Sequence, residues 1–498
     1  MATQFKEVWR LPVTRGLQLD CDTTEVTDGS FLTAHNFRFR NAAASLVGAA
    51  TPLAKVASGQ AIGHIGWHRD ADQADVVVIC TKDWVHTLGA ANPIYPLNVA
   101  PYGALFPWDS GSLLGKIVVV NPAHPPQVIN GVTIGNLPGG PNLANRVCDF
   151  AGHLILTRPA GNPQQIAGSG LNDATVWDYT DPATDADVMT IADGGDAVQL
   201  VKRCGDYLAL YKEKSTHLVS YVGMATNIYS QQNLTDQWGA VSQFAAEDVG
   251  GSRHVFMGRL NFYGLTLAGV QGIGDRVWPF ILKLKQSGQF TPLLETNVWC
   301  ALNRAYDELI FSLPLANGGS AAVVYHFKED AWSTRDFPYT AAATVASTSQ
   351  AVPQTTIAQL LQMIGGMQDP IGGPAQALEE VFLAGDSAGN ISVLDTGAIN
   401  LAVGTLESGD TDYGDAYAVK QECGMFLRGD WTGVPPQVFV APRMARGDEL
   451  VWRGPFVPDY RGRVDYMATG RLFRHRIVKN GGTFQLFGYA PRMRGIGK

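Results

Sequence analysis

The segment Gly385–Gly389 is the best match in this chain to a catalytic motif. Its residues, Gly-Asp-Ser-Ala-Gly, fit the G-x-S-x-G pattern that presents a nucleophilic serine in α/β-hydrolases. That chemistry needs a strand before the serine and a helix after it, but Ile391–Asp395 has the composition of a strand. No His-Gly-Gly-Gly element is present to form an oxyanion hole. Because these residue types are also common in turns, we interpret the segment as a hairpin turn.

His64 and His68 are spaced as a pair of metal ligands would be on a helix. Two histidines four residues apart on one helical face can bind zinc. However, Ile62–His68 contains two glycines and reads as a strand, in which the even-numbered positions share a face. This pattern favours solvated histidines at a sheet edge over a metal site.

Six aspartates cluster within nineteen residues: Asp178, Asp181, Asp185, Asp187, Asp193 and Asp196. Dense carboxylates can bind calcium, yet no D-x-[DN]-x-[DN]-G-x₅-E loop is present. A solvated, turn-rich connection is the favoured interpretation, and a calcium ion near Asp178–Asp196 stays open as the alternative.

The densest basic run of the chain is Arg471–Arg476. On a strand, Arg474 and Arg476 would project to one side with Leu472, and Arg471, Phe473 and His475 to the other. Such a strand could contact an acidic partner subunit or DNA phosphates. The candidate contact residues are Arg471, Arg474, Arg476 and Lys479. A solvated strand face is the alternative.

No other segment carries a catalytic or cofactor-binding pattern. The chain has no P-loop, no Rossmann glycine fingerprint and no triad signature, and it lacks the repeated S-x-D-x-G-x-T-W turn of sialidase-type propellers. The paired carboxylates of a glycosidase would meet only in the folded protein, so sequence leaves them open. We therefore predict no catalytic residue, no cofactor, no metal ligand and no enzymatic activity.

A hairpin unit recurs along the chain and predicts the architecture. Each unit reads as an apolar strand, a polar turn and an apolar strand, and the centres lie roughly 35 to 65 residues apart, as in the blades of a β-propeller. The seven stretches are Ala74–Leu88, Leu113–Val132, Phe150–Ile166, Gly205–Val222, Arg253–Ala268, Tyr306–Phe337 and Glu379–Asp395. The predicted fold is therefore all-β, a β-propeller of about six to seven blades with an additional C-terminal β domain.

Three parts are expected along the chain. Residues 1–60 form an N-terminal segment that completes the ring, and residues 61–399 form the propeller with an inserted loop near 341–378. Ile357–Ile364 within that loop has the composition of a short helix. Residues 400–434 are rich in glycine and aspartate and suggest a domain border, so residues 400–498 are predicted to be a C-terminal β-sandwich-like domain.

Composition fits a large folded protein. The chain has 498 residues, of which 46% are hydrophobic and 16% charged. No stretch approaches the roughly 18 apolar residues that cross a bilayer, and Met1–Leu11 has no apolar core, so neither membrane insertion nor a signal peptide is expected. The six cysteines are scattered without C-x-x-C spacing, which is typical of reduced, mostly buried thiols in cytoplasm.

Charge is unevenly distributed. Met425–Lys498 holds thirteen Lys/Arg and five Asp/Glu, a net charge of +8, so the other residues carry −16 of the total of −8. An acidic body with a basic C-terminal part suggests different partners at the two ends. The overall acidity argues against a tight sequence-independent DNA-binding protein.

Several segments together carry a resemblance to a known family. They are Leu11–Leu17, Asp28–Phe31, Asn36–Arg40, Phe150–Leu156, Val176–Asp178, Gly205–Thr216 and Gly470–Ile477. These segments resemble the tail nozzle, or packaged-DNA stabilisation, β-propeller proteins of short-tailed bacteriophages. The resemblance covers most of the chain, but residues 341–378 and 400–434 match nothing in that family.

The resemblance implies a structural protein of the virion tail, assembled in the host cytoplasm. Its partners would be five further copies in a homohexameric ring or tube, the adaptor (head-to-tail connector) ring above it, tail fibre or spike proteins, and packaged DNA passing through the channel. Since the centre of a six- or seven-bladed ring is narrower than a DNA duplex, that channel would lie between subunits. An acidic wall would let DNA slide because it repels phosphates. The alternatives are a glycan- or receptor-binding propeller and, less favoured, a propeller glycosidase.

Overall fold

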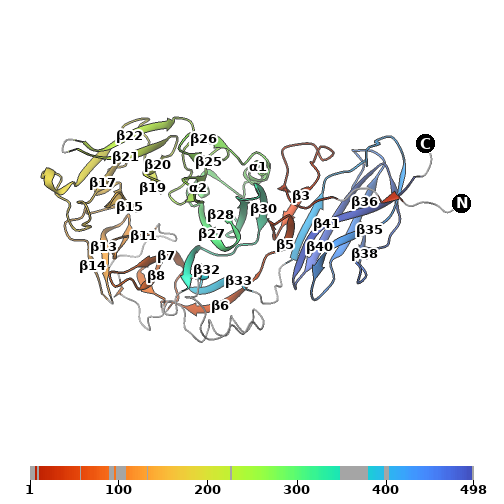
Figure 1. Ribbon diagram of the computed structural model, residues 1–498, viewed down its shortest axis with the longest axis horizontal. Helices are drawn as coiled ribbons and strands as arrows, with labels where there is room; N and C mark the ends of the chain where they lie inside the picture. The colour runs from red at the N-terminus through yellow and green to blue at the C-terminus, as the bar shows by residue number, and fades with distance from the viewer. Residues whose placement is uncertain are drawn as a thin grey trace, which may run out of the picture.

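The structure is a computed structural model that describes residues 6–7, 11–56, 58–88, 95–96, 108–131, 133–224, 227–347, 379–396 and 403–495. The fold is all-β, as predicted: 54% of it is strand and 5% is helix. Figure 1 shows two bodies, a ring of small sheets and a two-sheet unit that holds both chain ends. Among the described residues no helix is both long and apolar enough to span a membrane.

Seven four-stranded antiparallel units make up the ring within the described residues. The first is β7 (Ile62–Arg69), β8 (Asp75–Thr81), β9 (Trp84–Thr87) and β10 (Tyr95–Pro96); the second is β11 (Asp109–Leu113), β12 (Lys116–Asn121), β13 (His124–Asn130) and β14 (Thr133–Asn136). The third is β15 (Val147–Phe150), β16 (His153–Thr157), β17 (Gln165–Gly168) and β18 (Asp187–Thr190); the fourth is β19 (Val198–Cys204), β20 (Tyr207–Lys212), β21 (Thr216–Met224) and β22 (Asn227–Thr235).

The last three units complete the series. The fifth is β23 (Ala246–Asp248), β24 (His254–Met257), β25 (Phe262–Thr266) and β26 (Gly269–Gly272); the sixth is β27 (Trp299–Asn303), β28 (Glu308–Pro314), β29 (Ser320–His326) and β30 (Ala331–Arg335). The seventh is β31 (Ala341–Ser347), β32 (Glu379–Gly385), β33 (Asn390–Thr396) and, from the N-terminal part, β6 (Ala49–Lys55). The helices α1 (Trp278–Gln286) and α2 (Pro292–Glu295) lie between the fifth and sixth units.

The predicted hairpins are confirmed. In six of the seven units, each hairpin consists of the two middle strands of the sheet. In the sixth unit the predicted stretch also includes the outer strand. Middle strands are hydrogen-bonded on both edges and buried almost throughout; all five residues of β16 and the first six of β28 are buried. Inner strands such as β15 and β27 are less uniformly buried and include half-buried or exposed residues. The continuous apolar runs of the middle strands are therefore the pattern that sequence reveals most readily.

The inner strands surround a common centre. In order, β7 contacts β11, β11 contacts β15, β15 contacts β19, β19 contacts β23, β23 contacts β27, β27 contacts β31, and β31 contacts β7. The series of contacts therefore returns to its starting strand. Figure 1 shows the same arrangement, with β7, β11, β15, β19 and β27 facing the middle of the ring.

Both ends of the chain build the two-sheet unit. One sheet has the order β38-β35-β41-β5-β4, with β1 beside β41 and β39 beside β35; the other continues the sixth ring unit as β30-β2-β3-β34-β40-β36-β37. The N-terminal strands are β1 (Lys6–Glu7), β2 (Gly16–Leu17), β3 (Ser30–His35), β4 (Phe37–Arg40) and β5 (Ala43–Leu46). The C-terminal strands are β34 (Val403–Ser408), β35 (Lys420–Trp431), β36 (Gln437–Arg443), β37 (Arg453–Phe456), β38 (Arg463–Val464), β39 (Ala468–Gly470), β40 (Leu472–Asn480) and β41 (Phe484–Gly495).

The expected boundaries differ from this arrangement in two ways. Residues 1–60 divide between the two bodies, since β6 joins the ring and β1 to β5 join the C-terminal strands. Residues 400–434, expected to be an irregular border, contain β34 and the whole of β35. The two sheets share one core, with Met425 and Leu427 from one sheet and Val440 and Phe473 from the other. This is a sandwich-like arrangement to which both chain ends contribute.

The stretch 341–378, expected to be an inserted loop, starts with a strand. Ala341–Ser347 is β31, the inner strand of the seventh unit, which pairs along its whole length with β32. The remainder of that prediction, including a helix at Ile357–Ile364, lies outside the described residues. The alanine- and threonine-rich composition of β31 concealed a strand, because its short side chains give no strong apolar alternation.

All six cysteines are free, as predicted. Two of them, Cys80 and Cys204, are fully buried, and the other four are half-buried.

A buried ion network joins the N-terminal hairpin to the ring. On β4, Nε of Arg38 lies 2.7 Å from Glu308 on β28, and its Nη2 lies 2.8 Å from Asp395 on β33. Arg335 on β30 contacts the same two carboxylates at 3.4 and 3.2 Å, and the Arg38 guanidinium stacks 3.5 Å from the ring centre of Tyr306. The four charged side chains are at most 6% exposed. Two cations and two anions thus neutralise one another where the two bodies meet.

Candidate functional site

Polar side chains from the inner strands meet at the middle of the ring. We call His64, His68, Ser110, Arg146, Lys202 and Glu247 the axial cluster. They come from β7, β11, β19 and β23 and from the residue just before β15. These strands lie in five successive units, so dozens of residues separate most neighbours in the cluster, and only His64 and His68 attracted attention in the sequence.

Two imidazoles share one serine hydroxyl. Nε2 of His64 and Nε2 of His68 each lie 2.7 Å from Oγ of Ser110. Gly66 makes this approach possible, because a Cβ there would lie 2.2 Å from the same oxygen. The even positions of β7 therefore share a face, as predicted, but these histidines are half-buried and hydrogen-bonded to Ser110 instead of being fully solvated. They join the first ring unit to the second.

Both imidazoles are neutral in the folded protein. Burial lowers the pKa of His64 to about 3, and the positive charges of Arg146 and Lys202 lower it further. Burial lowers the pKa of His68 to about 4, and the two rings lie too close together for both to become charged easily. With both rings neutral, one Nε2 accepts a hydrogen bond from the serine hydroxyl and the other donates its N–H to the serine oxygen.

Arg146 reaches across the middle of the ring. It precedes the inner strand of the third unit, yet its guanidinium lies 4.0 Å from the ring centre of Phe244, which precedes the inner strand of the fifth. Its Nη1 lies 3.4 Å from Asp109 of the second unit. Arg146 is 6% exposed, and its Nε has no hydrogen-bond partner among the described residues. One side chain therefore connects three units and occupies the space that they surround.

A second ion pair lies beside it. Nζ of Lys202 on β19 is 2.5 Å from Glu247 on β23, so this pair joins the fourth and fifth units. Burial opposes the charge of Lys202, but Glu247 outweighs it and raises the lysine pKa. Burial raises the pKa of the nearby Cys148 thiol to about 12 and also raises that of Cys300. These thiols are protonated at neutral pH and are poor nucleophiles.

The pair of histidines on Ser110 differs from a serine–histidine–carboxylate triad. A serine within reach of a histidine can be a nucleophile only when a third group orients the base. In the part of the chain that the structure describes, neither His64 nor His68 has a carboxylate within ion-pair distance. The cluster instead links inner strands around the middle of the ring.

We expect Gly66→Ala to destabilise the ring by about 1–3 kcal/mol, since the new methyl group would displace Ser110 from both imidazoles. Gly135→Ala is the matched control: Gly135 also lies in a strand, β14, and a Cβ there meets no atom within 4 Å. Urea unfolding followed by tryptophan fluorescence would compare the two variants. Equal stabilities would contradict a tight contact at Gly66.

Two of the four predicted contact residues, Arg474 and Lys479, lie inside the protein. Arg474 is 7% exposed, and its Nε and Nη2 lie 3.0 and 2.8 Å from Asp410. Lys479 is fully buried and donates to the backbone oxygens of Thr432 and Val434 at 2.9 and 2.6 Å. Neither residue is available for a partner or for DNA, so the prediction is corrected at these two positions.

The other two predicted contact residues are more accessible. The side chain of Arg476 is 33% exposed, pairs with Glu407 at 2.8 Å and stacks over Trp452, whereas Arg471 is exposed. The predicted alternation along this strand is correct. However, β40 lies between β34 and β36 in the sheet, and the acidic partners on and beside β34 were too distant in sequence to be recognised.

The remaining sequence candidates are turns. Asp386 accepts hydrogen bonds from the amides of Ala388 and Asn390 at 2.9 and 2.8 Å and closes the predicted hairpin between β32 and β33. In the aspartate cluster, Asp178 and Asp181 likewise accept from backbone amides two residues ahead. Within the described residues no group of three or more His, Cys, Asp or Glu side chains is arranged to hold a metal ion.

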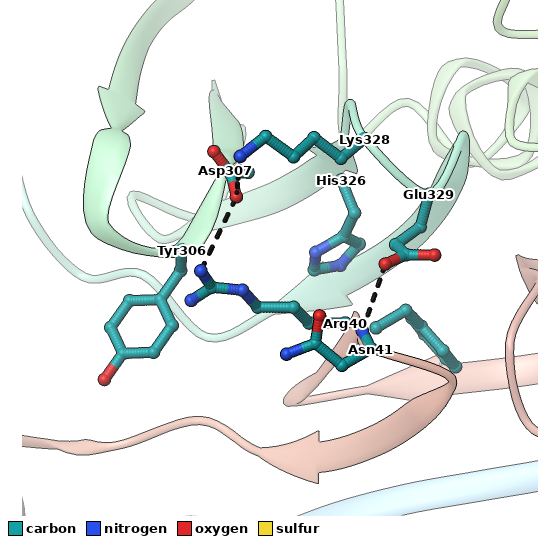
Figure 2. A pocket seen from close by; sticks show the side chains of 8 residues that line it. Arg40, Asn41, Tyr306, Asp307, His326, Lys328 and Glu329 are labelled. Atoms are coloured by element: carbon teal, nitrogen blue, oxygen red, sulfur yellow. Dashed lines mark hydrogen bonds and ion pairs between the residues drawn. The ribbon is translucent and has the colours of Figure 1, made fainter.

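A small pocket marks the contact between the N-terminal hairpin and the ring. Figure 2 shows Arg40 and Asn41 facing Asp307, Lys328 and Glu329. Lys328 lies 2.9 Å from Asp307, and the amide of Asn41 donates to Glu329 at 3.0 Å. The cavity measures about 80 Å³. Because its charged groups pair with one another and its volume suits only a few waters, it acts as a junction.

Comparison with known proteins does not assign this chain to a family. No family model matches the chain, and no curated protein matches it. Among solved structures, the extracellular domain of a hybrid two-component system from B. thetaiotaomicron is 9% identical, with a TM-score of 0.40, over 81% of this chain and 47% of that one. The computationally designed Ika8 protein is 7% identical, with a TM-score of 0.38, over 77% and 99%.

A third solved structure is similarly distant. PorZ, a surface component of the type-IX secretion system of Porphyromonas gingivalis, is 8% identical, with a TM-score of 0.36, over 72% of this chain and 42% of that one. The chain thus spans about half the length of the two bacterial proteins that it matches. At these TM-scores the similarities carry no information about function.

Proposed function

We propose that this chain is a seven-bladed β-propeller with an attached sandwich, and that it is a non-catalytic component of a bacteriophage tail. In this proposal six copies form a nozzle or tube below the adaptor ring, where tail fibres or spikes can attach. The assembly retains packaged DNA and releases it on ejection. The class of protein comes from the resemblance of segments such as Asn36–Arg40 and Gly205–Thr216 to tail nozzle proteins.

Side chains that make contacts across the middle of the ring are the observation that carries the proposal. Arg146 stacks on Phe244 there, and the Lys202–Glu247 pair joins the inner strands beside it. A DNA duplex could not pass through such a centre without breaking these contacts. The proposed channel therefore lies between subunits, and each ring serves as a rigid part of the wall.

Charge supports the same arrangement. Outside Met425–Lys498 the chain carries a net charge of −16. An acidic wall repels phosphates, so DNA would move along it without being held. The basic C-terminal part would then serve contacts between proteins.

Assembly tests the proposal directly. We expect the purified protein to form rings of six in negative-stain images, alone or after addition of the matching adaptor ring, and to gain about sixfold in mass by light scattering. Neighbouring genes for a portal or an adaptor would agree with this result. A protein that stays monomeric with the adaptor present, or that turns over a polysaccharide, would overturn the proposal.

A further inference from the structure

One side of the two-sheet unit ends in two edge strands, each of which pairs with a single neighbour. In the strand orders of the two sheets, β37 and β38 are terminal strands, and residues 457–462 connect them. We call residues 451–471 the open edge. Terminal strands present backbone N–H and C=O groups without partners in the sheet, and proteins usually protect them with charges, prolines or covering segments.

The open edge is unusually apolar for a surface. Val451 is 61% exposed, Val457 53%, Tyr460 84% and Met467 64%. Of the eighteen exposed large apolar side chains among the described residues, nine lie in residues 403–495, which are roughly a fifth of those residues. Clustered exposed apolar side chains rimmed by polar residues mark interaction sites.

The rim of this edge is positively charged. From Arg461 to Arg471 alternate residues are exposed, because the intervening positions face the core. Arg463 pairs with Asp465 at 2.8 Å. Arg453, Arg461 and Arg471 have no carboxylate partner among the described residues, and all three are exposed. The edge therefore has an unbalanced positive charge beside its apolar side chains.

A surface of opposite charge lies at the other end of the molecule. Residues 177–197, which we call the acidic loop, contain six aspartates and no Lys or Arg. Only Asp196 pairs with a cation within the described residues, the buried Lys212 at 3.1 Å. Asp178, Asp181 and the 41% exposed Tyr179 face solvent. In Figure 1 the third unit, with β15 and β17, lies at one end of the long axis and β38 near the other.

We propose that the open edge of one copy docks on the acidic loop of the next copy. Opposite ends of one elongated molecule with complementary charge give a head-to-tail contact, which closes into a ring when the rotation allows it. This inference rests on the proposed assembly and names its contact. Apolar side chains at the centre would supply affinity, while the arginine–aspartate pairs would fix the orientation.

Charge reversal with rescue tests the contact in the full-length protein. We expect Arg461→Glu with Arg471→Glu, and separately Asp178→Lys with Asp181→Lys, to weaken self-association at least about a hundredfold, because like charges would then face each other. Mixing the two variants should restore rings of alternating copies, since every edge then faces a loop of opposite charge. Lys283→Glu, an exposed charge change on α1, is the control and should assemble normally.

The outcomes separate this inference from the proposed function. If the unaltered protein forms rings and both reversals leave them intact, the open edge is not the contact, although the assembly stands. If each reversal abolishes rings and the mixture fails to restore them, the two surfaces do not face each other. If the unaltered protein never assembles, even with an adaptor ring, both proposals are wrong. Thermal unfolding of each variant verifies that these exposed substitutions leave the fold intact.

Discussion

Arg38→Ala should lower the free energy of unfolding by about 3–5 kcal/mol, the cost of removing one partner from a buried ion pair. Its guanidinium contacts Glu308 and Asp395, whose side chains are 1% and 2% exposed. Without Arg38 these carboxylates would keep only Arg335 as a charged partner, and one negative charge would stay buried without compensation. The loss should be greatest where the N-terminal hairpin meets the ring.

Arg40→Ala is the matched control, because Arg40 lies two residues away on the same strand and its side chain is 40% exposed. Its pair with Asp307 spans 3.8 Å, so its removal should cost less than about 1 kcal/mol. Urea unfolding of both variants would measure the difference. If Arg38→Ala stays within about 1 kcal/mol of the unaltered protein, the network is not a stabilising junction.

The same network should make the stability of the protein depend on pH in acid. Burial alone would raise the pKa of Asp395, but Arg38 and Arg335 outweigh it and hold the pKa at about 2. A carboxyl with a lowered pKa stabilises the fold above its unfolded pKa of 3.8 and loses that contribution as pH falls toward the folded value. Stability from Asp395 should therefore disappear between about pH 4 and pH 2.

Acidification should also destabilise the ring at a higher pH, through His64 and His68. Their pKa values fall from 6.5 in the unfolded chain to about 3 and about 4 in the folded protein. Between about pH 4 and 6.5 the unfolded chain therefore binds up to two protons that the native protein does not bind. Stability rises with pH wherever the unfolded state holds more protons. These two residues should contribute a slope approaching about 2.7 kcal/mol per pH unit near pH 5.

Urea unfolding at several pH values between 4.5 and 6.5 would measure this slope and would exclude the titration of Asp395. In the double variant His64→Gln, His68→Gln, the unfolded chain should bind up to two fewer protons on acidification, so the slope of stability against pH should be smaller. His86→Gln removes another imidazole whose pKa is lowered by burial. It should reduce the slope by the contribution of one proton at most. A double variant with the slope of the unaltered protein would show that neither imidazole is buried in its neutral form.

Sequence alone could predict the strands whose surroundings are uniform. The middle strands of the units are buried on both faces, so runs such as Leu208–Tyr211 and Leu309–Phe311 must be apolar wherever the unit lies in the ring. The turn at Asp386 was equally readable, because its hydrogen bonds come from residues two and four positions ahead. Local interactions of this kind leave their pattern within a few neighbouring residues.

Tertiary structure alone decided what the polar residues do. Ser110 lies 42 residues from His68, and Arg146 meets Phe244 across the middle of the ring. The sequence predicts Arg474 to be a surface cation, but in the structure it pairs with the buried Asp410, 64 residues away. A charged side chain is equally compatible with solvent and with a distant counter-ion, so its sequence neighbours do not distinguish the two. Apolar periodicity therefore determined the units from sequence, while only the ring closure and the packing of the two sheets determined which charges lie inside and which remain for partners.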